Sequence, residues 1–277
     1  MLLGVHCSVS GGLENAFTEA EALGIDTMQI FTRNQRQWKA KPISEEEQAA
    51  YLSAFKGSRV KVGFSHCSYL INLAAEDDAI REKSIAALTE ELIRCTKLGL
   101  AYCVLHPGAA GSQPPETAMD KIAEGLRIAL NETSDSDVMV LLENTAGQGS
   151  SVGGPFENLW YITQKVKSKR IGYCFDTCHA FAAGFDIRTE SGMKETMQKF
   201  DEVLGLENLK VFHLNDSKGD LGSHLDRHEH IGHGKLGLDP FRYIMNHFQN
   251  IPKVIETEKE GDWDNKNLET LKSLLKK

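Results

Sequence analysis

Eight short apolar runs alternate along this chain with segments of helical periodicity, and this alternation limits the folds that the chain can adopt. The runs are LLGVHC, TMQIFT, VKVGFSH, AYCVLH, VMVLLE, IGYCFD, LKVFH and PKVIE. Strands that alternate with helices form a parallel sheet, because each helix returns the chain to the edge from which the previous strand started. The sequence therefore predicts a parallel α/β fold.

The segments between the runs carry apolar residues at the spacing of a helix. The first of these segments extends from Gly12 to Leu23, and Gly24 then follows at the position of a C-terminal cap. The second segment opens at Ser44 with Glu47 three residues later, which is the pattern of a capping box. Further helices are predicted over residues 77–98, 116–130, 156–166, 192–204, 239–248 and 265–275.

Eight strand-helix units in 277 residues favour a single (β/α)8 barrel over residues 1–277. An open doubly wound sheet is the alternative, but it would carry a glycine-rich phosphate loop after the first strand or gather its ligands at one switch point. The sequence contains neither feature, and it has no low-complexity linker that would separate a second domain. In (β/α)8 barrels the active site lies at the C-terminal ends of the strands.

Seven of the eight runs stop at or next to a His, Asp or Glu, although these types make up only about one residue in six. The seven residues are His6, His66, His106, Glu143, Asp176, His213 and Glu256. Because all strand ends of a parallel barrel meet at one mouth, these side chains are expected to converge there. Two short motifs add His179, three residues after Asp176, and the pair Asp226 and His228, whose i, i+2 spacing puts both on one side of an extended loop.

Nine of these residues are candidate metal ligands, because so many carboxylates and imidazoles can share one mouth only around cations. They are His66, His106, Glu143, Asp176, His179, His213, Asp226, His228 and Glu256. Nine ligands with one bridging carboxylate suit three ions, and a histidine-rich set without thiolates favours Zn²⁺, with Mn²⁺ as the second choice. Clustered metal ions of this kind catalyse the hydrolysis of phosphate esters. The other histidines at His6, His224, His230 and His247 are expected not to be ligands.

Two loops are candidates for contact with nucleic acid, although the net charge of −8 argues against a broad basic surface. The loop RNQRQWKAK combines Arg33, Arg36, Lys39 and Lys41 with Trp38 and contains no acidic residue. The loop HCSYLIN places Tyr69 and Leu70 just beyond a candidate ligand, where they could enter a base stack. The alternative for both loops is that their side chains serve only the fold.

Composition excludes several other classes of protein. No apolar stretch approaches the roughly 20 residues that span a bilayer. The N-terminus has no basic region ahead of its apolar residues, so it is not expected to be a signal peptide. The six cysteines are scattered without a CxxC pair, and buried thiols are expected. A cytoplasmic protein that does not bind membranes is predicted.

The motifs resemble those of the endonuclease IV family of apurinic/apyrimidinic endonucleases, and they occur in family order along the whole chain. The matching segments are FTRNQRQW (31–38), HCSYLINLA (66–74), LHPG (105–108), LENTAGQG (142–149), FDTCHAFAAGFD (175–186), FHLNDSK (212–218), DRHEHIGHG (226–234) and IETE (255–258). Two positions depart from the family pattern, namely Cys67 in the HCSY motif and His233 in HIGHG. The resemblance implies hydrolysis of the phosphodiester 5′ to abasic sites in double-stranded DNA, with 3′-hydroxyl and 5′-deoxyribose phosphate ends as products.

The resemblance also implies a role for each site residue. It implies a trinuclear zinc mechanism, with one position open to Mn²⁺, and with Glu143 and Glu256 as catalytic residues. The implied ligand groups are His66 with His106, then Asp176, His213 and Glu256, then His179, Asp226 and His228, with Glu143 bridging the first two groups. Insertion into DNA is implied for Arg36, Tyr69 and Leu70, and Asn34 and Gln35 are further candidates for DNA contact. A monomer without an obligate protein partner is expected.

Two other functions remain open at this point. Divalent-metal sugar isomerases share the predicted fold, but they use fewer ligands, which are mostly carboxylates. A non-enzymatic zinc-stabilised or nucleic-acid-binding module is the other alternative, although structural zinc sites are closed and usually rich in thiolates. The histidine-rich ligand set and the two loops favour the nuclease.

Overall fold

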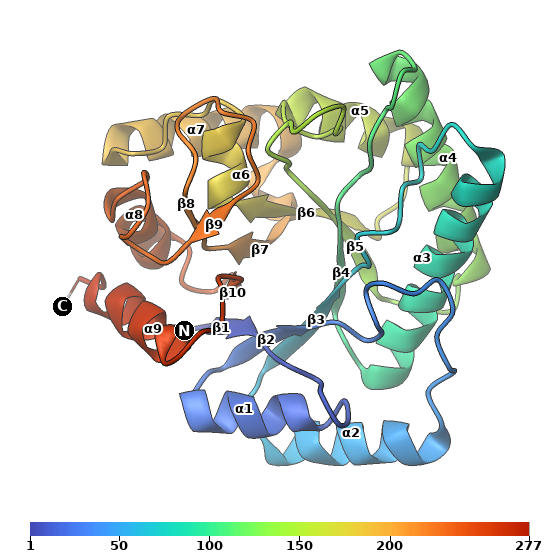
Figure 1. Ribbon diagram of the computed structural model, residues 1–277, viewed down its shortest axis with the longest axis horizontal. Helices are drawn as coiled ribbons and strands as arrows, with labels where there is room; N and C mark the ends of the chain where they lie inside the picture. Colours follow the sequence, from blue (N-terminus) through green and yellow to red (C-terminus); the bar gives the residue numbers. More distant parts are fainter. Residues whose placement is uncertain (277) are drawn as a thin grey trace.

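Eight parallel strands close into a barrel in the computed structural model, which describes residues 1–276 (Figure 1). The strands are β1 (Leu3–His6), β2 (Thr27–Ile30), β3 (Val62–His66), β4 (Tyr102–Leu105), β5 (Met139–Glu143), β6 (Ile171–Asp176), β7 (Leu209–His213) and β10 (Lys253–Ile255). Neighbours in the barrel follow chain order, and β10 pairs with β1 to close the ring. The predicted (β/α)8 fold is confirmed.

Helices surround the barrel and connect its strands (Figure 1). They are α1 (Asn15–Leu23), α2 (Glu45–Gly57), α3 (Asp78–Leu98), α4 (Pro115–Glu132), α5 (Phe156–Val166), α7 (Glu190–Leu204), α8 (Asp239–His247) and α9 (Trp263–Ser273). The predicted capping box is present, since the Ser44 side chain accepts the Glu47 N–H and the Glu47 carboxylate accepts the Ser44 N–H. Helix α1 begins at Asn15, later than the predicted start at Gly12, and it follows a turn in which Gly11 has φ 85°. No helix within residues 1–276 combines the length and apolar character that crossing a membrane requires.

Two apolar layers position the mouth of the barrel. The barrel interior is filled by Phe64, Val104, Leu141, Cys174, Val211 and Val254. A larger layer packs the outer face of the sheet against the helices, and it includes Cys7 and Cys67, which directly follow His6 and His66 in the chain. All six cysteines are free and buried, as the sequence predicted. Because the interior is packed with apolar side chains, polar groups at the strand ends can gather only above this packing.

Four short elements were not predicted from the sequence. They are α6 (Thr177–Ala182), η1 (Leu206–Asn208), β8 (Asp216–Ser217) and β9 (His228–Glu229). Strands β8 and β9 form an antiparallel pair within the long connection from β7 to α8. The buried Asp216 carboxylate holds the rest of this connection, since it accepts the N–H groups of Gly232 at 2.9 Å, Gly234 at 3.1 Å and Leu236 at 2.9 Å. This connection brings Asp226 and His228 to the mouth of the barrel.

Candidate metal centre

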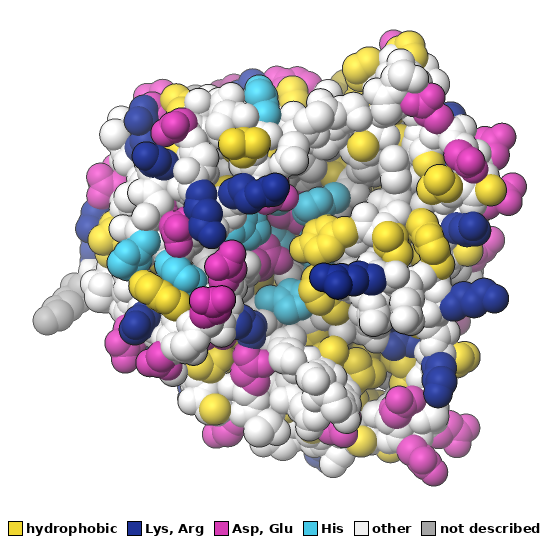
Figure 2. Space-filling view, in the orientation of Figure 1, with side chains coloured by type: hydrophobic (Ala, Val, Ile, Leu, Met, Phe, Trp, Pro, Cys, Tyr) yellow, Lys and Arg dark blue, Asp and Glu magenta, His cyan; other side chains and the backbone are white. Residues whose placement is uncertain are grey.

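The nine candidate ligands lie together at the C-terminal mouth of the barrel. His66, Glu143, Asp176 and His213 are the last residues of β3, β5, β6 and β7, and His106 directly follows β4. The others reach the same mouth from the end of β10 (Glu256), from α6 (His179), and from the β7–α8 connection (Asp226 and His228). Figure 2 shows histidine and acidic side chains gathered in a hollow near the middle of this face, with basic side chains beside it.

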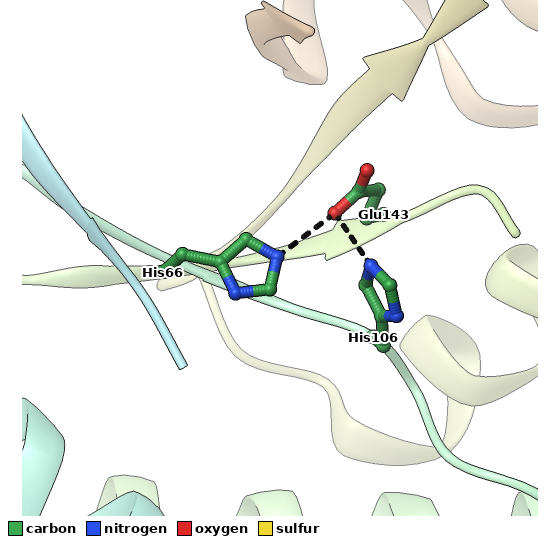
Figure 3. A group of neighbouring side chains, drawn as sticks. All are labelled: His66, His106 and Glu143. Atoms are coloured by element: carbon green, nitrogen blue, oxygen red, sulfur yellow. Dashed lines mark ion pairs between the residues drawn. The ribbon is translucent and has the colours of Figure 1, made fainter. Parts of the chain in front are cut away.

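Glu143 is completely buried at the centre of the group and uses both carboxylate oxygens. Its Oε2 atom lies 3.4 Å from His66 Nε2 and 3.2 Å from His106 Nε2, and both rings point toward it (Figure 3). Its Oε1 atom lies 3.0 Å from His213 Nδ1 and 3.2 Å from His179 Nδ1. One carboxylate therefore faces two different pairs of imidazoles, which is the geometry expected of a bridging ligand.

His179, Asp226 and His228 form a second group, in which the potential ligand atoms all lie within 4.8 Å of one another. Asp226 Oδ1 lies 3.2 Å from His179 Nε2 and 3.3 Å from His228 Nε2. The Asp176 carboxylate caps α6 by accepting the His179 N–H at 2.8 Å, and His179 Nδ1 lies 2.9 Å from the Asn144 carbonyl oxygen. These two contacts explain why an imidazole on a short helix faces the mouth.

A third group consists of His213, Glu256 and Asp176. His213 Nδ1 lies 3.1 Å from Glu256 Oε2 and 4.0 Å from Asp176 Oδ2. The buried Asn215 amide donates to both carboxylates, at 2.6 Å to Asp176 Oδ2 and 3.3 Å to Glu256 Oε2. Asn215 was not among the predicted site residues, because only His, Asp and Glu were considered as ligands at the strand ends.

The carboxylates and imidazoles of the centre shift each other's pKa values in opposite directions. Burial by itself raises the pKa of the Glu143 carboxyl, but the adjacent His213 and His106 lower it, and the net pKa lies well below its usual value. Burial lowers the pKa of His179, but the Asp176 carboxylate raises it, and the net pKa lies well above its usual value. Positive charge is therefore stabilised next to the Glu143 and Asp176 carboxylates.

Buried polar atoms that lack a hydrogen bond indicate whether metal ions fit the centre. Glu143 Oε2, His179 Nε2 and His228 Nε2 are buried and have no hydrogen bond to any group of the described residues. A buried polar atom without a partner costs about 1–3 kcal/mol, so three such atoms in one cluster need another ligand. Each of the three has a free lone pair when the imidazoles are neutral, and bound cations would satisfy all of them.

The chemistry of the donors favours nitrogen and oxygen ligands over sulfur. Cys174 lies near Glu143 and His213, and Cys178 lies near Asp176 and His228. Burial raises the pKa of both thiols to about 12, so they stay protonated near neutral pH and are poor ligands. Imidazoles and carboxylates remain, and this set fits a borderline divalent metal.

The five residues proposed for DNA contact lie at or near the rim of the mouth. Asn34, Arg36 and Tyr69 are exposed, Tyr69 with 62% of its surface accessible, while Gln35 and Leu70 are half-buried. The Tyr69 ring lies 5.1 Å from the His66 ring and 5.7 Å from the His106 ring, measured between centroids. Tyr69 also lines a cavity of about 480 Å³, together with His106, Thr145, Gln148, His179 and Asp226. An exposed aromatic ring therefore stands between the candidate metal centre and the solvent.

Arg33 does not belong to the exposed basic patch that the sequence predicted. Its side chain is buried and forms an ion pair with Glu90 of α3 at 2.8 Å. Its Nη2 atom also donates to the carbonyl oxygens of Gln37, at 3.1 Å, and Trp38. Arg33 therefore stabilises the conformation of the loop, whereas Arg36, Lys39 and Lys41 remain exposed.

Gln29 of β2 is a second polar residue that was missed. Its carboxamide contacts His6, His213 and Glu256 at the mouth. Strand β2 is the barrel strand whose apolar run ended without a His, Asp or Glu, so no candidate ligand was taken from it. The signal that could have found it is a glutamine on an otherwise apolar strand, at a position where a polar side chain needs partners.

The histidines that were expected not to be ligands lie outside the three groups. Burial lowers the pKa of His6 to about 3, so its ring is neutral. His224 Nδ1 lies 3.0 Å from the Ala146 carbonyl oxygen, and the His230 ring stacks on Trp263 at 4.0 Å. His247 is exposed on α8.

Comparison with known proteins adds independent information on relationship. A family model described as a xylose isomerase-like TIM barrel matches residues 17–277. A probable endonuclease 4 from Trichlorobacter lovleyi is 45% identical to this chain, and the match covers 98% of this chain and 99% of the relative. A probable endonuclease 4 from Chloroflexus aurantiacus is also 45% identical, with coverage of 98% and 97%.

Comparison with solved structures also finds an endonuclease IV. The crystal structure of endonuclease IV from Thermus thermophilus superposes with a TM-score of 0.89 at 34% identity, and the match covers 99% of this chain and 98% of that one. A D-tagatose 3-epimerase-like protein superposes with a TM-score of 0.76 at 20% identity, over 99% of this chain and 97% of that one. At that identity the likeness concerns the fold alone.

Proposed function

The chain belongs to the endonuclease IV family, and from this premise we propose that it hydrolyses the phosphodiester on the 5′ side of abasic sites in double-stranded DNA. The products are a 3′-hydroxyl end and a 5′-deoxyribose phosphate end. The observation that carries the proposal is the buried Glu143, whose two oxygens face two different pairs of imidazoles at the barrel mouth. In this proposal residues 1–277 act as one barrel domain and as a monomer.

The metal centre is proposed to hold three Zn²⁺ ions, with Mn²⁺ as a possible occupant of one position. His66 and His106 hold the first ion, Asp176, His213 and Glu256 hold the second, and His179, Asp226 and His228 hold the third. Glu143 bridges the first two. Bound ions of this kind lower the pKa of water and neutralise the charge of a phosphate. Support comes from the three buried atoms that lack a hydrogen bond and from the neutral state of the nearby thiols.

In this proposal, two carboxylates take part in catalysis and residues of two loops hold the DNA at the metal centre. Glu143 and Glu256 are proposed as catalytic residues, because both carboxylates approach His213 Nδ1 at the centre, at 3.0 Å and 3.1 Å. Arg36, Tyr69 and Leu70 hold the distorted duplex, with Asn34 and Gln35 as further contacts. The cavity beside Tyr69 is large enough for a deoxyribose phosphate that has turned out of the helix.

Metal analysis paired with a cleavage assay tests this function. Protein purified without chelator is expected to contain about three divalent ions per chain, and to cut a duplex with one abasic analogue at the 5′ phosphodiester. Borohydride is not expected to trap a protein-DNA adduct, because no lysine attacks the sugar. One ion per chain would exclude the trinuclear centre, and a trapped adduct would indicate a lyase. Epimerisation of a ketose without DNA cleavage would favour the sugar isomerase class instead.

A further inference from the structure

Gln29 lies fully buried in the middle of β2 and faces the mouth of the barrel. In the sheet it is in register with His6 of β1 on one side and with Phe64 of β3 on the other. Phe64 belongs to the apolar group inside the barrel, so Gln29 also faces inward. Burial of an amide among apolar side chains is costly unless its hydrogen bonds are satisfied.

The Gln29 amide is satisfied by groups of the metal centre. Its Nε2 atom donates to Glu256 Oε1 at 2.5 Å and lies 2.9 Å from His6 Nδ1. Its Oε1 atom lies 2.8 Å from His213 Nε2. An ionised carboxylate can only accept hydrogen bonds, so the NH₂ group must face Glu256 and the amide oxygen must face His213. The orientation of the amide therefore follows from its partners.

This orientation determines which nitrogen of His213 carries the proton. An amide oxygen cannot donate, so His213 Nε2 must be protonated in order to bond with Gln29. In a neutral imidazole the lone pair then lies on Nδ1. Nδ1 is the nitrogen that faces Glu143 Oε1 at 3.0 Å and Glu256 Oε2 at 3.1 Å. The same amide binds Glu256 Oε1 and so turns the other oxygen, Oε2, toward Nδ1.

We propose that Gln29 is a positioning residue for the metal centre. By one amide it selects the His213 tautomer that can bind a cation through Nδ1, and it orients the Glu256 carboxylate toward the same point. The inference rests on the proposed function, since it assigns Gln29 a role toward the second ion of the centre. Partners of this kind, which hold a ligand from behind, typically change metal affinity by about 10–100-fold.

Thr27 provides a matched control on the same strand. It is also fully buried, it lies two residues before Gln29 and thus on the same face, and its hydroxyl donates to the Val62 carbonyl oxygen at 2.7 Å. Thr27 contacts none of the nine candidate ligands through this bond. Thr27→Val therefore removes one buried hydrogen bond of β2 without changing any contact to the candidate ligands, and it measures the effect of that loss alone.

The experiment compares the wild-type protein, Gln29→Met, Gln29→Asn and Thr27→Val, all loaded with zinc. Met keeps the length of the side chain without its hydrogen bonds, and Asn is one methylene too short to reach both partners. The rate of metal loss to a chelator, the ions bound per chain, and kcat and KM on an abasic duplex are measured. After removal of the metal, side-chain nitrogen chemical shifts report the tautomer of His213.

Both Gln29 variants are expected to lose metal at least about 10-fold faster than Thr27→Val. We expect kcat to fall and KM for the duplex to stay close to the wild-type value, because DNA contacts are untouched. In the metal-free Gln29 variants, the His213 signals should no longer show a single tautomer. If Gln29→Met does not fold, Gln29→Asn carries the test, since it is smaller than the native residue.

Equal rates of metal loss in the Gln29 variants and in Thr27→Val would overturn the inference. The proposed function fails separately, namely if the wild-type protein holds no divalent metal or does not cut the abasic duplex. Wild-type protein that binds metal and cleaves, together with Gln29 variants that behave like Thr27→Val, would leave the function standing and remove only the role of Gln29.

Discussion

Glu143 contacts four imidazole rings through its two carboxylate oxygens, and each oxygen serves a different pair of rings. A neutral side chain of the same shape would therefore remove the negative charge of Glu143 from both pairs of imidazoles. The carboxylate charge, rather than its hydrogen-bonding geometry alone, is what cations at this mouth require.

Glu143→Gln is therefore expected to lose more than one metal ion and to reduce cleavage of abasic duplex by at least about 100-fold. Elemental analysis and a cleavage assay measure both effects. Glu91→Gln is the matched control, because Glu91 is also buried but bonds to Thr32 away from the centre, and it should keep its metal content. Three ions in Glu143→Gln would contradict the bridging role.

Lys253 is a buried cation that has no carboxylate partner within residues 1–276. It is completely buried at the start of β10, and its ammonium donates to the carbonyl oxygens of Ile251, at 2.7 Å, and Phe248. Burial lowers its pKa from 10.5 to about 8. Between these two values the unfolded chain binds more protons than the folded chain, so the free energy of unfolding rises with pH in that window. Below about pH 8 both states are protonated and the contribution is constant.

The difference in unfolding free energy between the wild-type protein and Lys253→Met should therefore increase as the pH rises from about 8 to 10.5. The increase should be up to about 3 kcal/mol, and the difference should be flat below pH 8. Denaturant unfolding at a series of pH values measures it. A difference that does not change across this window would show that Lys253 keeps an ordinary pKa.

At the scale of elements, the loop between β2 and α2 is tied to α3 by two arginines. Arg94 of α3 donates to the Thr32 hydroxyl at 2.9 Å and to the Lys41 carbonyl oxygen at 2.8 Å. Arg33 of the loop pairs with Glu90 of α3 at 2.8 Å. The loop is thus held at both ends while Arg36 stays exposed at its tip. Arg33 and Arg36 are only three residues apart, but Arg33 holds the loop in place whereas Arg36 is free to contact a ligand.

Arg33→Ala and Arg36→Ala should separate these tasks. Arg33→Ala leaves Glu90 and two backbone carbonyls without a donor, and it should lower the free energy of unfolding by about 1–3 kcal/mol. Arg36→Ala should leave stability unchanged but weaken binding to abasic duplex. Thermal denaturation and a binding titration at fixed salt measure the two effects. Equal loss of stability in both variants would contradict the division.

Tyr69 belongs to the loop after β3 and is expected to act as a wedge in the base stack. Tyr69→Ala should weaken binding to abasic duplex by about 1–3 kcal/mol, with metal content unchanged. An abasic dinucleotide has no base stack to open, so its cleavage should fall much less. If cleavage of both substrates falls equally, Tyr69 supports the metal centre or the fold and does not open DNA.

At the scale of the whole molecule, stability is expected to depend on bound metal. Nine carboxylates and imidazoles from six of the barrel strands, α6 and the β7–α8 connection share one mouth, so the proposed cations would link segments that are distant in the chain. A ligand that binds only the folded state raises the melting temperature. Chelation should therefore lower the melting temperature by several degrees, and added Zn²⁺ should restore it. An unchanged melting temperature after verified metal removal would rule out this linkage.

The periodicities of the sequence were sufficient to predict the barrel and the convergence of the six candidate ligands at strand ends, whereas His179, Asp226 and His228 came from two short motifs. The physical reason is topological, because parallel strands that close into a barrel all end at one mouth. Residues such as His66, Glu143 and His213 are therefore brought together by their position at strand ends, whatever the details of packing. Their assignment to metal ions is a proposal that the geometry supports.

Only the tertiary structure decided what Gln29 and Arg33 do. Gln29 bonds with Glu256, which lies 227 residues away in the chain, and Arg33 pairs with Glu90, 57 residues away. The residues next to Gln29 in the sequence are those of any buried strand, and the residues next to Arg33 are those of any exposed loop. The flanking sequence therefore could not reveal either partner. The short elements α6, β8 and β9 depend likewise on long-range bonds, such as those of Asp216. Local periodicity determines where strands and helices form, whereas hydrogen bonds between distant segments determine which way a polar side chain points.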